Sequence, residues 1–263
     1  MASRGDIVVV TVNYRLSTLG FLALNDGTTN GNFGLADQIV ALDWVKEYIT
    51  AFGGDPDRIT IAGESAGAAS VRTFLASPLA IGKYAGAIME SSPRRRYSSY
   101  LSILEVSILV EPILAEIGCN LSDVLECLRA YDANALVNLA HIASSLVGDG
   151  TYIVYTELSL NGSGDVAGIH VMIGNLLMKR WTFGASTRRR YGLTAFDPNH
   201  PVCDAPPDAT HPYGNPSEEY FKCHTGELYF FFGTLPSDRP YRDAEDLPFM
   251  QTALDAWTAF ART

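Results

Sequence analysis

The segment Gly63-Glu-Ser-Ala-Gly67 has the residue types and spacing of a nucleophile turn. It reads G-x-S-x-G, follows a strand-like run that contains β-branched residues and precedes a run of small helix-forming residues. In that context the serine lies on a very tight turn from strand to helix, with its hydroxyl exposed above a sheet. Ser65 is therefore predicted to attack a carbonyl carbon and to form an acyl-enzyme.

Three neighbours of Ser65 have predicted supporting roles. Gly63 and Gly67 carry no Cβ, and we expect both to prevent collisions between the strand and the helix. The N–H of Ala66 belongs to the start of the helix, where backbone donors and the positive end of the dipole favour a developing oxyanion. Ala66 is the predicted donor of an oxyanion hole.

The elements that must position this turn alternate between strand and helix patterns. Uninterrupted or nearly uninterrupted apolar runs predict strands, and apolar residues at three- and four-residue steps predict helices. The order favours an α/β fold with a mostly parallel, doubly wound sheet. The predicted strands are Ile7–Val12, Arg58–Ala62 and Tyr84–Met89, and the predicted helices are Leu35–Phe52 and Ala66–Ala76.

The rest of the chain reads as a helical region followed by a less regular one. Residues 93–141 are mostly helical in pattern, 169–173 read as a strand, and 249–260 read as an amphipathic helix. We predict one domain over residues 1–263. Its three parts are a core with the Ser65 turn over 1–92, a helical insertion over 93–147, and a region with the acid, the histidine and the last helix over 148–263.

Charge and composition exclude several classes of function. The net charge of −10 and a sequence pI of about 4.9 disfavour a nucleic-acid partner. No apolar run approaches the ~18 residues of a membrane span. No signal peptide is visible at the N-terminus, and no H-E-x-x-H or C-x-x-C motif indicates a metal. We expect no metal and no other cofactor, and the sequence predicts no particular oligomeric state.

The motifs around Ser65 resemble the type-B carboxylesterase/lipase family, which includes cholinesterases. The similar segments follow the family's order almost without a gap over residues 6–92. The resemblance implies an α/β-hydrolase fold and a serine esterase or lipase that acts on a small-molecule or lipid ester. The segments are Asn13–Leu16, Gly20–Leu22, Asn32–Gln38, Ala41–Val45, Phe52–Pro56 and Gly63–Gly67.

A serine hydroxyl needs a general base, and His224 is the predicted one. α/β-Hydrolases have the chain order Ser, acid, His, and His224 is the last of the five histidines. It also lies in Phe221–Gly233, which is similar to the family's histidine motif. A zinc or structural role with Cys203 and Cys223 is the alternative, and it lacks a convincing ligand set.

The position of the triad acid departs from the family pattern. Aligning Gly174 with the glycine of the family's G-x-x-x-D-E-G segment places Lys179 on the acid. A lysine has donors only, so it cannot accept the imidazole N–H, and its charge opposes an imidazolium. Glu157 and Asp165 are the candidate substitutes.

Two further departures lead us to expect impaired activity. By the resemblance, the H-G-G-G segment that completes the oxyanion hole would precede Met1, and the stretch from Lys179 to His224 is shorter than in the family. We therefore expect a copy of the enzyme that is truncated at its start and shortened internally. The alternative function is that of a non-catalytic, cholinesterase-like pseudoenzyme or interaction module.

The four cysteines bear on disulfides and location. The resemblance implies a Cys119–Cys127 disulfide, because Gly118-Cys119 and Cys127-Leu-Arg129 look like the family's small disulfide loop. Cys203 and Cys223 form a second candidate pair. The family resemblance favours a secreted or extracellular protein, whereas the lack of a visible signal peptide leaves a cytoplasmic location open.

Overall fold

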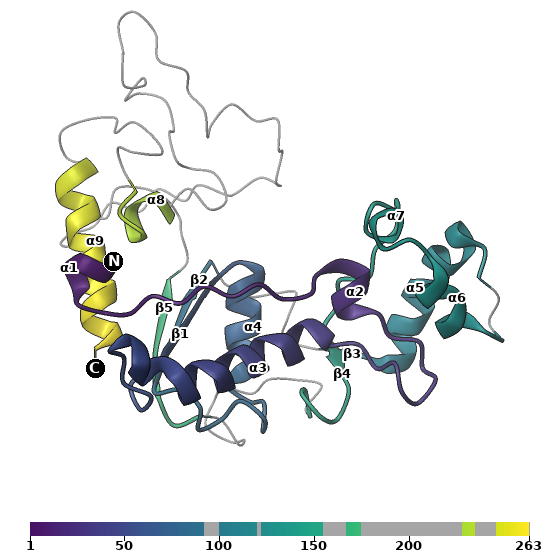
Figure 1. The fold of residues 1–263 in the computed structure, drawn as a ribbon, viewed down its shortest axis with the longest axis horizontal. Coiled ribbons are helices and arrows are strands. Elements are labelled where there is room, and N and C mark those ends of the chain that lie inside the picture. The colour runs from purple at the N-terminus through teal and green to yellow at the C-terminus, as the bar shows by residue number, and fades with distance from the viewer. Residues whose placement is uncertain (92–99, 120–121, 155–166, 175–227, 235–245, 263) are drawn as a thin grey trace, which may run out of the picture. The chain divides into compact units, whose positions relative to one another are not determined.

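A computed structural model describes residues 1–91, 100–119, 122–154, 167–174, 228–234 and 246–262 of the chain (Figure 1). The chain forms two compact units. The larger is Val10–Met172, and the smaller combines Met1–Val9 with Ile173–Thr263. The turn at Ser65 belongs to the larger unit.

A sheet that contains a parallel pair of strands lies in the larger unit. β1 (Thr60–Glu64) pairs in parallel with β2 (Gly86–Glu90), with Glu64 opposite Glu90 at the carboxyl ends. β5 (His170–Gly174) completes the order β1-β2-β5. The strands predicted over Arg58–Ala62, Tyr84–Met89 and 169–173 are confirmed, with boundaries that shift by one or two residues. Parallel pairing between β1 and β2 requires a crossover, and the helix between these strands supplies it.

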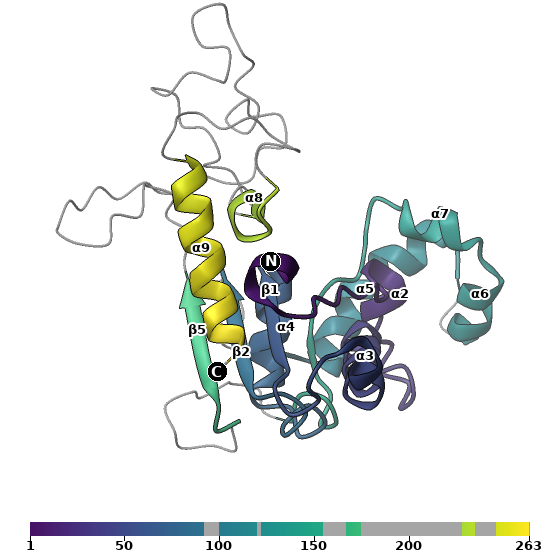
Figure 2. The ribbon, with the colours of Figure 1, turned by 60° about the vertical axis from the view of Figure 1, so that its left-hand side comes forward.

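That crossover helix is α4 (Ala66–Phe74), which packs against β1 and β2 (Figures 1 and 2). Its small residues allow a close approach to the sheet, since Ala68 is fully buried and Ala69 nearly so. Val71 and Phe74 join the main hydrophobic cluster of this unit. The predicted helix after Ser65 is confirmed.

A second long helix, α3 (Phe33–Tyr48), continues into a turn of 3-10 helix, η1 (Ile49–Phe52). Its buried residues Leu35, Ile39 and Leu42 recur at helical spacing, as the sequence predicted. Gly53 ends the element with φ of 82°, a left-handed conformation that glycine adopts without steric cost.

The region after residue 99 is mainly helical in its described part, which confirms the sequence prediction. Ser102 and Glu105 form a capping box at the start of the longest of these helices, each accepting a backbone hydrogen bond from the other residue. A short helix from earlier in the chain, α2 (Ser17–Phe21), also belongs to the larger unit. The remaining elements are β3 (Leu101–Ser102), α5 (Ile103–Ile117), α6 (Val124–Ala130), α7 (Ala133–Val137) and β4 (Val147–Gly148).

A buried asparagine ties the start of α3 to β4. Asn32 is fully buried and has φ of 60°, a conformation that asparagine tolerates better than most residues. Its side-chain amide donates to the Val147 carbonyl at 2.6 Å and accepts from the Val147 N–H at 3.0 Å. The Asn32 side-chain amide thus pairs with the Val147 backbone in the way that a neighbouring strand would.

The smaller unit packs α1 (Ala2–Gly5) and α8 (Leu228–Phe231) against α9 (Asp246–Ala261), as Figures 1 and 2 show. The Arg4 guanidinium donates to both carboxylate oxygens of Asp255, at 2.7 and 2.8 Å. The helix predicted over 249–260 is confirmed and begins at Asp246.

The longest helices of the described chain are too short to span a bilayer. α3 and α9 have 16 residues each, whereas a span needs about 20. Within the described residues, no helix combines the length and apolarity of a membrane span.

The predicted buried strand Ile7–Val12 is wrong. Residues 7–12 have no regular secondary structure, and Val8, Val9, Val10 and Val12 are 38–43% exposed. β-Branched residues favour a strand because they pack well on a pleated, half-buried surface, and not through the backbone alone. In the part of the chain that the structure describes, no strand pairs with residues 7–12. These β-branched side chains therefore have no sheet surface on which to pack.

Candidate active site

Ser65 lies between the last residue of β1 and the first residue of α4. Its N–H donates to the Glu90 carbonyl of β2 at 3.0 Å, and its own carbonyl accepts from the Ala69 N–H at 3.0 Å. The serine is therefore held by the neighbouring strand on one side and by the helix on the other. The predicted strand-to-helix turn is confirmed.

The backbone of Ser65 is in an unusual conformation. Its φ of 53° and ψ of −113° lie outside the regions that residues with a side chain normally occupy. Such a conformation costs on the order of 1–3 kcal/mol and persists only where the surroundings enforce it. Here the two hydrogen bonds of Ser65 and the packing of α4 on the sheet enforce it, so the folded core holds the serine at the point of the turn.

Gly63 is required by the close approach of α4 to β1. A Cβ at this position would overlap the carbonyl group of Gly67 and would lie 2.8 Å from the Ala68 nitrogen. Both neighbours are helix backbone, which cannot move aside without displacing α4. This close approach supports the role predicted for Gly63.

At Gly67 the structure shows no such close approach. A Cβ at Gly67 would meet no heavy atom within 4 Å in the described structure. The two glycines of the motif differ because Gly63 faces the helix across the turn, whereas Gly67 is already inside α4 with open space beside it.

Ala66 is the predicted oxyanion donor. It is the first residue of α4 and is exposed. The first N–H groups of a helix have no acceptor within the helix, and they carry the positive end of its dipole. The Ala66 N–H can therefore stabilise negative charge that develops on a carbonyl oxygen next to Ser65.

Two carboxyl side chains lie next to the turn. Glu64 and Glu90 are opposite each other at the ends of β1 and β2, so their side chains share one face of the sheet. Glu90 is 7% exposed and Glu64 is half-buried. Burial raises the pKa of Glu64 to about 7. Neither carboxyl is among the site residues predicted from sequence, although the parallel order of the two strands implies that their ends meet.

The raised pKa of Glu64 makes stability depend on pH. A carboxyl with a pKa near 4.5 in the unfolded chain and about 7 in the fold binds its proton more tightly when folded. The free energy of unfolding should therefore fall as pH rises from about 4.5 to about 7.

We expect Glu64→Gln to become more stable relative to the unmodified chain as pH rises from 5 to 8, measured by urea unfolding. Glu126→Gln, which changes an exposed carboxyl of α6, should show no such gain; equal behaviour of the two variants would contradict this prediction.

The predicted base and acid candidates lie outside the described residues. These are His224, Lys179, Glu157 and Asp165, so their roles stay predictions. Two other histidines are described. His141 is exposed and its Nδ1 lies 3.2 Å from a Glu116 carboxylate oxygen, and His170 is exposed on β5.

The carboxylesterase family model matches residues 1–157, well over half of the chain. The chain belongs to the carboxylesterase family. The match covers the Ser65 turn, both β1 and β2, and the helical region after them. The resemblance inferred from the motifs is thus confirmed.

The matches to curated relatives cover about two thirds of this chain. Pyrethroid hydrolase Ces2e of Rattus norvegicus is 37% identical over 179 residues, which is 66% of this chain and 31% of that protein. Neuroligin-2 of Mus musculus is also 37% identical, over 183 residues, which is 66% of this chain and 22% of that protein. The matched part therefore spans a third or less of these relatives.

A solved esterase structure is similar to this chain. PNB esterase superposes with a TM-score of 0.72 and 26% identity, covering 99% of this chain and 66% of that one. Together with the β1–α4–β2 arrangement, this confirms the α/β-hydrolase fold class.

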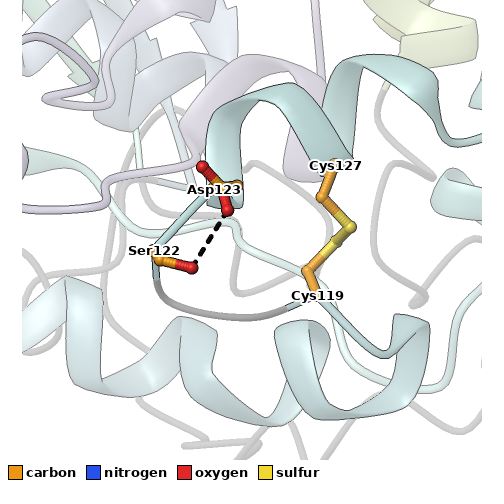
Figure 3. Close-up of a disulfide and its surroundings, with 4 residues drawn as sticks. All are labelled: Cys119, Ser122, Asp123 and Cys127. Carbon is orange, nitrogen blue, oxygen red and sulfur yellow. Dashed lines mark hydrogen bonds between the residues drawn. A yellow bond between two sulfur atoms is a disulfide. The ribbon is translucent and has the colours of Figure 1, made fainter.

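The disulfide that the family resemblance implied is present. Cys119 and Cys127 are bonded, with their Cα atoms 5.8 Å apart (Figure 3). The bond links the residue after the C-cap of α5 to the middle of α6, and the loop between them includes Ser122, whose hydroxyl donates to Asp123 at 3.0 Å. The candidate pair Cys203–Cys223 lies outside the described residues.

Removing this disulfide should cost only modest stability. The loop that it closes is short, so the chain-entropy contribution is about 2–3 kcal/mol. We expect the double variant Cys119→Ser/Cys127→Ser to unfold at a lower temperature than the unmodified chain under oxidising conditions, and at the same temperature under strong reductant. A difference that persists in reductant would show that the serines perturb the fold by another route.

Proposed function

We propose that this chain is a serine carboxylic-ester hydrolase that acts through an acyl-enzyme on Ser65. One observation carries the proposal: Ser65 is held in a strained turn at the start of α4, in a chain of the carboxylesterase family. A hydroxyl at such a turn projects from the protein next to backbone N–H groups, which is the arrangement that acyl transfer needs.

In the proposed reaction the Ser65 oxygen attacks the ester carbonyl while His224 takes up the hydroxyl proton. The carbonyl oxygen becomes an oxyanion that accepts a hydrogen bond from the Ala66 N–H. His224 then gives its proton to the departing alcohol oxygen as the carbon–oxygen bond breaks, which leaves an acyl group on Ser65. A water molecule, activated by the same imidazole, hydrolyses that acyl-enzyme and regenerates the serine.

The third member of the triad determines how fast this proposed reaction runs. Lys179 occupies the aligned acid position, and Glu157 and Asp165 are the candidate substitutes. Loss of the acid costs about 10⁴ in kcat, and loss of oxyanion donors costs about 10²–10³ more. We therefore propose slow turnover.

The proposed substrates are small-molecule or lipid esters, in keeping with relatives such as the pyrethroid hydrolase. The acidic net charge argues against nucleic acid. A secreted or extracellular location is also proposed, supported by the Cys119–Cys127 disulfide, because disulfides persist in oxidising compartments.

A non-catalytic role is the second candidate. The similarity to neuroligin-2 and the lysine at the aligned acid position favour it. Under this alternative the Ser65 turn would persist as part of the fold, and the hydroxyl would not react.

Covalent labelling with a fluorophosphonate probe separates the two candidates. The proposed hydrolase should be labelled at Ser65 in the purified chain, as peptide mass spectrometry can locate, and Ser65→Ala should not be labelled. A chain that unfolds cooperatively yet takes up no label in an extended incubation would support the non-catalytic role. Labelling that persists in Ser65→Ala would place the nucleophile elsewhere and overturn the assignment.

A further inference from the structure

A cavity of about 510 Å³ lies in the larger unit, apart from the Ser65 turn. Its walls come from α2, the segment before α3, α6 and α7. None of residues 63–67 lines it. The volume falls in the range of cavities that hold small organic ligands.

Most of the cavity wall is apolar. Leucines from three helices surround it, together with Phe33 at the start of α3. Leu22, Leu128 and Leu136 are buried, and Leu19 is 42% exposed. Such a wall favours a hydrocarbon chain over water, because apolar surface on both sides is then removed from solvent.

Several polar groups in the wall already have partners. The Arg15 guanidinium donates to both oxygens of Asp37 at 2.7 Å. The hydroxyls of Thr28 and Thr29 donate to Asp26 at 3.1 and 2.8 Å. Because these side chains already have hydrogen-bond partners, they do not require a ligand to satisfy them.

Arg129 and Tyr131 differ from these groups. Both line the cavity at the end of α6, and the side chain of neither makes a hydrogen bond or ion pair with another described residue. Arg129 is exposed, and none of the described residues that line the cavity is an aspartate or a glutamate. A guanidinium and a phenol hydroxyl are both donors, so together they suit one carboxylate.

We propose that this cavity binds a monocarboxylate with an alkyl chain, of the fatty-acid class. Arg129 and Tyr131 donate to the carboxylate at the rim, and the leucines enclose the chain. The site is separate from Ser65 and does not depend on ester hydrolysis.

Calorimetric titration of the full chain with decanoate tests the charge requirement. A Ser65→Ala background removes any contribution from acyl transfer. Arg129→Gln should weaken decanoate binding about tenfold or more, because a charge-assisted hydrogen bond is lost. Arg58→Gln, which removes an exposed cation that does not line the cavity, should leave binding unchanged. If both variants weaken decanoate binding equally, the effect reflects the net charge of the chain, and the proposed site is wrong.

A second pair of variants tests whether decanoate binding needs the apolar wall of the cavity. Leu19→Trp should fill the cavity and abolish decanoate binding at unchanged thermal stability, whereas Leu109→Trp, on the exposed face of α5, should not affect binding. Acetate should bind far more weakly than decanoate, and decan-1-ol should bind equally to the unmodified chain and to Arg129→Gln. The proposal fails if acetate matches decanoate. It also fails if Leu19→Trp abolishes only a concentration-dependent dimer in sedimentation, since the cavity would then be a protein interface.

Discussion

Replacing Gly63 with alanine should both destabilise the larger unit and strongly reduce labelling of Ser65. The added Cβ overlaps the Gly67 carbonyl and lies 2.8 Å from the Ala68 nitrogen, so α4 must move away from β1. Overpacking of this kind costs about 1–3 kcal/mol. A displacement of about 1 Å at a reacting group can cost 10²-fold in rate. We expect a lower urea midpoint and fluorophosphonate labelling slower by about that factor.

Gly67→Ala is the matched control, because it adds the same methyl group at the other end of the motif. Its Cβ meets nothing within 4 Å, and it replaces a glycine inside α4. Alanine is favoured over glycine inside a helix by about 0.5–1 kcal/mol, so this variant should be as stable as the unmodified chain or more stable. If Gly63→Ala and Gly67→Ala behave alike, the close approach of α4 to β1 is not what sets the geometry of Ser65.

Lys179→Glu should raise the rate of ester hydrolysis. We expect the unmodified chain to hydrolyse short p-nitrophenyl esters barely above background, because a lysine at the acid position cannot accept the imidazole N–H of His224 and opposes its positive charge. A carboxylate there can do both. Since the triad acid contributes about 10⁴ in kcat, a recovery on the order of 10² is a reasonable expectation for an imperfectly placed replacement.

A Lys179→Met control separates the two physical effects. It removes the repulsion without supplying an acceptor, so it should raise the rate less than Lys179→Glu does. Two results would overturn the assignment of the acid position. One is rapid hydrolysis of p-nitrophenyl esters by the unmodified chain. The other is an unchanged rate in Lys179→Glu together with loss of activity in Glu157→Gln.

The local elements of the core could be predicted from sequence because each has a strong local cause. α3 follows from apolar residues at helical spacing with Gly53 at its end, and α4 from small residues after the turn. β2 is an apolar run that is buried along its whole length. The Ser65 turn was predictable for the same reason, since its strand, its motif and its helix are contiguous in the chain.

Tertiary structure decided the features that depend on what lies opposite a residue. Ile7–Val12 has the composition of a buried strand, yet no strand of the described chain pairs with it, so it stays exposed. Gly63 and Gly67 have the same residue type in one motif, but only Gly63 faces the backbone of α4. The carboxyl of Glu90 lies beside Glu64 because parallel pairing brings two strand ends to one edge. Sequence patterns record the preferences of single segments, whereas burial, close approach and pKa are set by neighbours that only the fold brings together.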